Sequence, residues 1–155
     1  MLFPMKARPA LSYHSGGRKF GALRDNGMRR HAGCDLIAPI GTPVYAVADG
    51  EIIAFYHFFK TSFAIEVDHG DFLVRYGEVK PQLAAGLAKG SRVFAKQLLG
   101  EVGKLEGLNS SMLHFELYAG THRGPLTVAA NEPFRRRADL TDPTRALDEA
   151  ALPFG

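Results

Sequence analysis

The sequence predicts a mainly β fold, in the form of a small antiparallel sheet domain. Seventeen glycines and nine prolines separate many short runs of β-branched and aromatic residues, which is typical of short strands joined by tight turns. Stretches with helical periodicity are scarce. With 155 residues the chain has the length of one domain, so we expect residues 1–155 to form a single domain.

Alternation of apolar residues, interrupted by turn residues, places the expected strands. Residues 41–53 predict two strands around an Asp-Gly turn. Residues 63–68 and 72–76 predict a hairpin that turns at residues 69–71. Further strands are expected after the turn at 89–91, over 98–102 and over 112–118.

Helix is expected in only two places. Residues 81–89 can hold one short turn, and residues 142–152 can hold a short helix with Pro143 at its first helical position. Between the last strand and this helix, residues 119–138 are rich in Gly, Pro, Thr and Arg. They predict a long loop excursion, and loops of that length are usually functional or disordered.

Composition excludes several classes of function. The net charge is +3, and the basic residues are scattered except at Arg29–Arg30 and Arg135–Arg137, so no nucleic acid is expected as a partner. These two clusters are expected to be solvated surface, or alternatively to meet an anionic wall polymer. Cys34 is the single cysteine, so an intrachain disulfide is impossible. No apolar run is long enough to span a membrane.

The cellular location stays open at this stage. The first residues lack the pattern of a signal peptide. Action in the periplasm or cell wall would therefore need another export route. The sequence does not indicate an oligomeric state.

Two short segments carry residues suited to metal binding. On an extended chain His31, Gly33 and Asp35 share one face, whereas Cys34 points to the opposite face, toward the core. Imidazole nitrogen and carboxylate oxygen are good zinc donors, and glycine leaves room between them. A His and an Asp four residues apart are weak evidence by themselves.

The strand at 112–118 contributes the second segment. One face of this strand is an apolar stripe that must pack in the core, made of Leu113, Phe115 and Leu117. The other face is made of Met112, His114 and Glu116. Because it lies opposite a continuous core stripe, His114 either faces water or points into a site.

Together these segments resemble the lysostaphin-like (LytM-type) zinc metallopeptidases. The run from His31 to Gly50, with His-x-x-x-Asp, Gly-Thr-Pro-Val and Asp-Gly, is similar to the family pattern. The similarity continues through Val67-Asp68-His69-Gly70, Lys89-Gly90 and Leu113-His114-Phe115-Glu116, and it ends at Asp142-Pro143. It covers about residues 20–147, which the resemblance implies as the core of the domain.

The resemblance implies a zinc site and a substrate class. The family's zinc ligands fall on His31, Asp35 and His114, a set that leaves a fourth position for water. Zinc-bound water would then attack the carbonyl of a peptide cross-link in bacterial peptidoglycan. The implied fold is a small antiparallel sheet with a groove over it, and the aromatic cluster from Phe55 to Phe63 is a candidate for its lining.

The chain departs from the family at two catalytic histidines. Met112 stands where the family has the first His of a His-x-His pair, and Glu78 stands where it has a His in a Tyr-x-His strand. A thioether cannot transfer protons, so Met112 is expected to line a groove. Glu78 can act as a base, and strand parity places Tyr76 on its face as a possible hydrogen-bond donor to an oxyanion. Glu116 would orient a ligand or face water.

Three functions remain open from the sequence. The first is a zinc endopeptidase on peptidoglycan with Glu78 as base. The second is a catalytically impaired metal-binding module that binds a wall peptide or a protein partner. The third is a purely structural domain. The retained ligand triad argues against the third, because a scaffold has no evident need to bury such polar groups.

Overall fold

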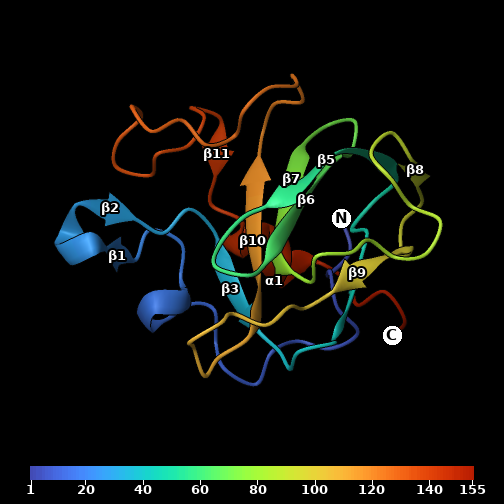
Figure 1. Cartoon of the computed structure of the whole chain (residues 1–155), viewed down its shortest axis with the longest axis horizontal. Helices are drawn as coiled ribbons and strands as arrows, with labels where there is room; N and C mark the ends of the chain where they lie inside the picture. Colours follow the sequence, from blue (N-terminus) through green and yellow to red (C-terminus); the bar gives the residue numbers. More distant parts are fainter.

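The computed structural model describes residues 1–155 and is dominated by one antiparallel sheet (Figure 1). Six of its strands follow the order β11-β10-β7-β6-β5-β8, and β3 also pairs with β10. Their bounds are β3 Cys34–Ile37, β5 Gly50–His57, β6 Phe63–Asp68, β7 Leu73–Val79, β8 Arg92–Val93, β10 Met112–Tyr118 and β11 Leu140–Thr141. The mainly β prediction is confirmed.

Smaller elements flank this sheet. Two two-stranded ribbons are formed by β1 with β2 and by β4 with β9. The bounds are β1 Leu23–Arg24, β2 Arg29–Arg30, β4 Pro43–Tyr45 and β9 Leu98–Glu101, with short 3-10 turns η1 Gly16–Arg18 and η2 Asp25–Gly27. The helix α1, Thr144–Glu149, lies behind the sheet in Figure 1. No helix is both long and apolar enough to cross a bilayer.

Most of the expected strands are found close to their predicted bounds. The hairpin of 63–68 with 72–76 forms as β6 and β7, and 112–118 is β10. The two strands expected within 41–53 form as β4 and the start of β5, on either side of the Asp-Gly turn, but they do not pair with each other: β4 pairs with β9, and β5 pairs with β6 and β8. Pro143 caps α1 rather than beginning it, and Asp142 Oδ1 accepts a hydrogen bond from the Thr144 amide at 2.9 Å.

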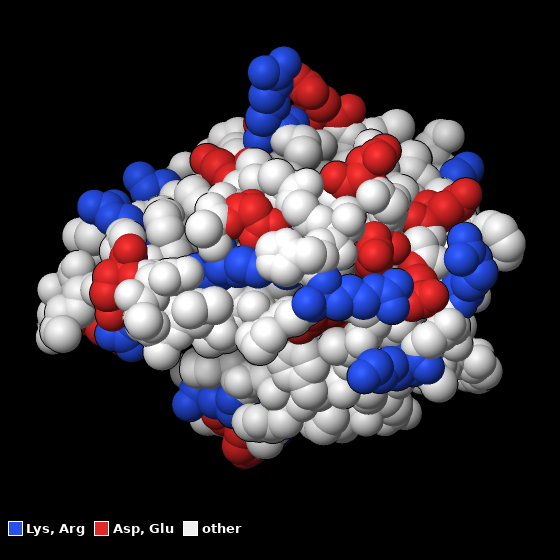
Figure 2. Space-filling model, turned by 90° about the horizontal axis from the view of Figure 1, so that it is seen from above, with Lys and Arg blue, Asp and Glu red and all other residues white.

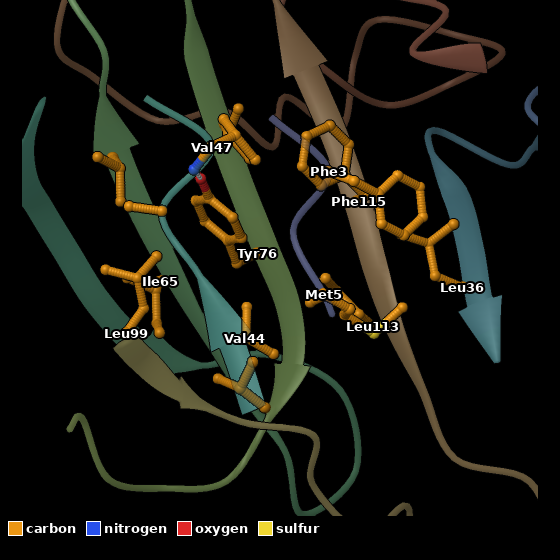
Figure 3. Close-up of a cluster of buried hydrophobic side chains, with 14 of the residues drawn as sticks. Phe3, Met5, Leu36, Val44, Val47, Ile65, Tyr76, Leu99, Leu113 and Phe115 are labelled. Carbon is orange, nitrogen blue, oxygen red and sulfur yellow. Dashed lines mark hydrogen bonds between the residues drawn. The ribbon is translucent and has the colours of Figure 1, made fainter. Parts of the chain in front are cut away.

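The main core lies on one face of the sheet. Leu113 and Phe115 of β10 pack there with Tyr76 of β7, as Figure 3 shows. Phe3 and Met5 are also part of this core, so it extends beyond the 20–147 that the resemblance implies. Cys34 is fully buried in it, as strand parity predicts.

The opposite face of the sheet carries buried polar side chains. Register places His114 opposite Gly77 and Glu116 opposite Arg75, so these four residues share a face. On the other edge of β10, His114 lies opposite Asp35. Since alternate residues of β10 point to opposite faces, one short strand contributes both to the core and to a polar cluster.

Gly33 permits the close approach of β3 to β10. A Cβ atom at this position would lie 2.4 Å from the Phe115 carbonyl oxygen and 3.1 Å from His114 Cε1. We predict that Gly33→Ala lowers the free energy of unfolding by about 1–3 kcal/mol, the usual cost of overpacking. Urea unfolding would measure the change.

Gly100→Ala is the matched control for this prediction. A Cβ atom at Gly100, also in a strand, would meet no atom closer than 3.5 Å, so little change is expected. Equal unfolding free energies for the Gly33 variant and the unmodified chain would contradict the role given to Gly33.

Candidate metal centre

Three side chains from two paired strands and the segment before them converge on one point. Asp35 Oδ1 lies 3.1 Å from His31 Nε2 and 2.9 Å from His114 Nδ1, and the two nitrogens are 3.2 Å apart. All three residues are buried, with exposed fractions of 8% or less. The structure therefore brings together the three residues that the resemblance implies as ligands.

The spacing of these atoms fits a tetrahedral metal ion. Donors about 2.0–2.1 Å from a zinc ion lie roughly 3.3 Å from one another, close to the separations found here. Two imidazole nitrogens and one carboxylate oxygen also match the donor types of zinc sites. The residues present thus fit the ion, with one tetrahedral position left over.

In His31 and His114, the ring nitrogen that points away from Asp35 is hydrogen-bonded to an oxygen acceptor. His31 Nδ1 donates to the Lys19 carbonyl oxygen and His114 Nε2 donates to Glu116 Oε1, both at 2.8 Å. With a metal ion bound, each ring would keep its proton on this outer nitrogen and present its other nitrogen, which faces Asp35, to the ion. Glu116 takes the orienting position considered for it from the sequence.

Glu116 is the centre of a buried charge network. Arg136 Nε donates to Glu116 Oε1 at 3.1 Å, Tyr118 donates to Oε2 at 2.5 Å, and Arg75 Nη1 lies 3.4 Å from Oε2. Burial raises the pKa of Glu116, but Arg75, His114 and Arg136 outweigh it and hold the pKa well below its usual range. The network therefore keeps Glu116 ionised beneath His114.

The same carboxylates act on the site itself. Burial lowers the pKa of His114, but the hydrogen bonds and charges of Asp35 and Glu116 raise it to about 10. Burial raises the pKa of Asp35, but hydrogen bonds to His114 and His31 hold it well below its usual range. The cluster thus favours positive charge, which a divalent ion would supply.

A groove of about 490 Å³ opens onto these three residues. Its apolar walls are Phe58, Phe59, Leu105, Leu108 and Met112, and Tyr56 and His57 also line it. The aromatic cluster thus contributes four consecutive lining residues, 56–59. Met112 lies at the groove, as expected, where its thioether supplies surface and no proton.

Glu78 also lines the groove, because of a β-bulge that the alternation of side chains along a regular strand does not predict. The pairing of β6 with β7 shifts between Phe63 and Ala64, which leaves Glu78 as an extra residue in β7 with φ of +64°. Such a bulge turns a side chain to the other face of a sheet. Glu78 Oε2 is buried with no hydrogen-bond partner, and burial raises the pKa of Glu78 to about 7.

Tyr76 does not lie at the site. Its ring is fully buried in the main core, and its hydroxyl is bound to the Val47 amide at 3.1 Å and to His69 Nε2 at 2.9 Å. Figure 3 shows the contact with Val47. The expectation that Tyr76 and Glu78 share a face is wrong, because the bulge separates them.

Four arginines that no sequence motif indicates belong to the site. Arg24, Arg29 and Arg136 line the groove, and Arg75 lies beneath it. The expectation that Arg135–Arg137 is solvated surface is wrong for Arg136, bound to Glu116, and for Arg137, which pairs with Asp139 at 2.7 Å. The sequence feature that could have indicated these arginines is Glu116, because a glutamate that faces the interior requires a cation as its partner.

Comparison with known proteins places the chain in a family. Residues 29–125 match the sequence pattern of peptidase family M23. The chain belongs to this family. Among curated relatives, the peptidoglycan DD-endopeptidase ShyC of Vibrio cholerae is 29% identical over 103 residues, which are 65% of this chain and 23% of that protein. The chain therefore spans about a quarter of the length of that relative.

Solved structures show the same fold. The catalytic domain of lysostaphin from Staphylococcus simulans aligns with a TM-score of 0.62 at 20% identity, over 84% of this chain and 90% of that chain. A zinc containing peptidase from Vibrio cholerae aligns with a TM-score of 0.60 at 24% identity, over 74% of this chain and 35% of that chain. The chain thus has the LytM-type fold of its family.

The network around Glu116 leads to a stability prediction. Removing one partner of a buried charge network leaves the others uncompensated, so Glu116→Gln is expected to lower the free energy of unfolding by about 3–5 kcal/mol. Glu106→Gln is the control, since the side chains of Glu106 and Lys104 are both about two-thirds exposed and such pairs contribute roughly 0–1 kcal/mol. Similar losses in the two variants, measured by urea unfolding, would argue against the network.

Burial of Glu78 leads to a pH prediction. Between its usual value near 4.5 and the folded value of about 7, the Glu78 carboxyl is protonated in the folded chain and ionised in the unfolded chain. The pH-dependent part of the cost of its burial is therefore absent below pH 4.5 and grows to roughly 3 kcal/mol above pH 7. Glu78→Gln should stabilise the metal-free chain by an amount that rises over this window, measured by unfolding in chelator. A pH-independent difference would contradict the shift.

Proposed function

We propose that this chain is a zinc-dependent endopeptidase domain that hydrolyses peptide cross-links of bacterial peptidoglycan. The observation that carries the proposal is the convergence of His31, Asp35 and His114 within 3.2 Å of one another in an apolar-walled groove. Membership of peptidase family M23 supports the reaction class. The likeness to ShyC, a peptidoglycan DD-endopeptidase, supports the substrate class.

The residues around the ion site have separate tasks. His31, Asp35 and His114 would hold zinc, which when bound lowers the pKa of a water molecule and polarises a carbonyl group. The Lys19 carbonyl and Glu116 keep the two imidazoles in the tautomers that present their lone pairs. Phe58 and Met112 supply apolar wall to the groove, against which a bound substrate would displace water.

Glu78 is the proton carrier in this proposal. Glu78 lines the groove and its Oε2 has no hydrogen-bond partner, so the carboxyl group would accept a proton from the attacking water and pass it to the leaving amine. The amide C–N bond then breaks, and water ends as a hydroxyl on the new carboxyl group and a proton on the new amine. Tyr76 takes no part, because its hydroxyl is engaged in the core.

A second candidate function is a metal-binding module that binds wall peptide or a protein partner without cleaving it. Met112 supports this candidate, because it lines the groove beside the ligands and cannot replace an imidazole as acid, base or hydrogen-bond donor. The two functions share the ion site and differ only in turnover. They are therefore separable by one experiment that measures metal and products independently.

The test incubates the zinc-loaded chain with cross-linked muropeptides and follows the products by mass spectrometry. Parallel samples contain chelator, His114→Ala or Glu78→Gln, and bound zinc is measured in each protein. We expect one zinc per chain and cleavage in the unmodified protein. We expect loss of both in His114→Ala, and retained zinc with a rate about 10²–10⁴-fold lower in Glu78→Gln, the usual range for a general base.

His57→Gln serves as the matched control. His57 lines the groove, is exposed and is bound to the Lys60 carbonyl, but it is not a ligand, so both zinc and cleavage should persist. Bound zinc with intact muropeptides over several peptide chemistries would reject the peptidase in favour of the binding module. Absence of bound zinc in the unmodified chain would reject both.

A further inference from the structure

The groove has one wall of a different chemical character. The β1–β2 ribbon supplies Arg24 and Arg29 to the lining, whereas the β5–β6 hairpin and residues 105–112 supply aromatic and aliphatic side chains. On the face seen in Figure 2, basic and acidic residues are interspersed, and the net charge is only +3. A preference for anions would therefore arise from local geometry rather than from the overall field.

Arg24 and Arg29 are held side by side by the ribbon. They are direct cross-strand partners in the register of β1 and β2, and both side chains are about one-quarter exposed. Like charges directly opposite each other destabilise a strand pair. A two-stranded ribbon that nevertheless holds two guanidinium groups at a groove has an arrangement suited to an anion.

The two arginines differ from the third arginine of the groove in how their charge is compensated. Arg136 is bound to Glu116 through Nε and Nη2, each at 3.1 Å. Arg29 Nε pairs with the exposed Asp25 at 3.0 Å. Arg24 Nη2 donates to the Gly17 carbonyl at 2.6 Å, and its only carboxylate within 4.0 Å is Asp35, at 3.7 Å.

The charge of Arg24 is therefore fixed in place but weakly compensated. Neutral carbonyl groups orient its guanidinium without cancelling the charge. Asp35 is a ligand in the proposed ion site, so its negative charge would be shared with a divalent ion. Arg24 is then the cation nearest to the reaction point whose charge remains available to a substrate.

We infer that Arg24 and Arg29 form a carboxylate subsite, and that the groove selects peptides with a free carboxylate on a residue adjoining the scissile bond. This inference rests on the proposed function. Guanidinium groups bind carboxylates through paired N–H donors in a fixed plane. The contact between Arg24 and Asp35 sets the subsite beside the ligands, within the reach of one amino-acid residue.

The test compares two synthetic cross-linked peptides that differ in one group. One has a free α-carboxylate on the residue that donates the amine to the cross-link, and the other has the corresponding amide. Binding to the zinc-loaded chain is measured by calorimetry with Glu78→Gln as background, so that the peptides stay intact. We expect the carboxylate peptide to bind about 10-fold or more tightly, the range of charge-assisted hydrogen bonds.

Arg24→Gln should remove this preference by weakening the carboxylate peptide alone, and Arg29→Gln should reduce it. Arg24→Lys, which keeps the charge without the paired donors, should retain part of it. Arg145→Gln is the control, because Arg145 lies on α1 with its side chain 88% exposed. Thermal unfolding of Arg24→Gln should stay close to that of the parent chain, because relief of the repulsion with Arg29 offsets the lost hydrogen bond to the Gly17 carbonyl.

Three results would overturn the inference. They are equal binding of the two peptides, equal weakening of both by Arg24→Gln, and no binding of either peptide. A failure of the proposed function is distinguishable from these, because the unmodified chain would leave both peptides uncut while the binding preference for the carboxylate persisted.

Discussion

The antiparallel pairing of β3 with β10 is the constraint on which the rest of the site depends. It places Asp35 directly opposite His114 and leaves His31, four residues earlier, able to reach both. The pairing is close because Gly33 has no side chain to contact the Phe115 carbonyl. The three ligand residues therefore converge although His31 and His114 are 83 residues apart in sequence. Backbone hydrogen bonds, rather than flexible loops, fix this convergence.

Beneath this pairing, the sheet has a second buried face that is polar. Isolated buried charges are expensive, and removing one partner of such a group costs more than the group contributes as a whole. Here Glu116 receives donors from Tyr118 and Arg136 and lies beside Arg75. Arg136 belongs to the long 119–138 excursion, so the loop is anchored to the sheet by the residue that keeps Glu116 ionised. The stability of this region and the orientation of His114 thus have a common origin.

Residue patterns were sufficient for part of this arrangement. Strict alternation gave β6, β7 and β10 close to their bounds, because each strand has a core stripe on one face. The resemblance to a known family identified the three converging residues. Residue patterns failed where a local irregularity of the backbone sets the direction of a side chain, or where a contact distant in sequence sets its partner. The bulge at Glu78 reverses a side chain that parity assigned to the face of Tyr76, and the partners of Arg24, Arg75 and Arg136 are set only by tertiary packing.

The two departures from the family pattern that the resemblance implies, at Met112 and Glu78, would have unequal consequences for chemistry. Met112 leaves an apolar wall in place of a group that can transfer a proton. Glu78 leaves a carboxyl group on a bulge, buried enough that its pKa rises to about 7, in the range useful to a general base. A groove with one such carboxyl and a weakly compensated guanidinium differs from a groove with two imidazoles. In the proposed function, proton transfer then rests on Glu78 alone, and in the inferred subsite Arg24 binds a substrate carboxylate with a charge that does not titrate.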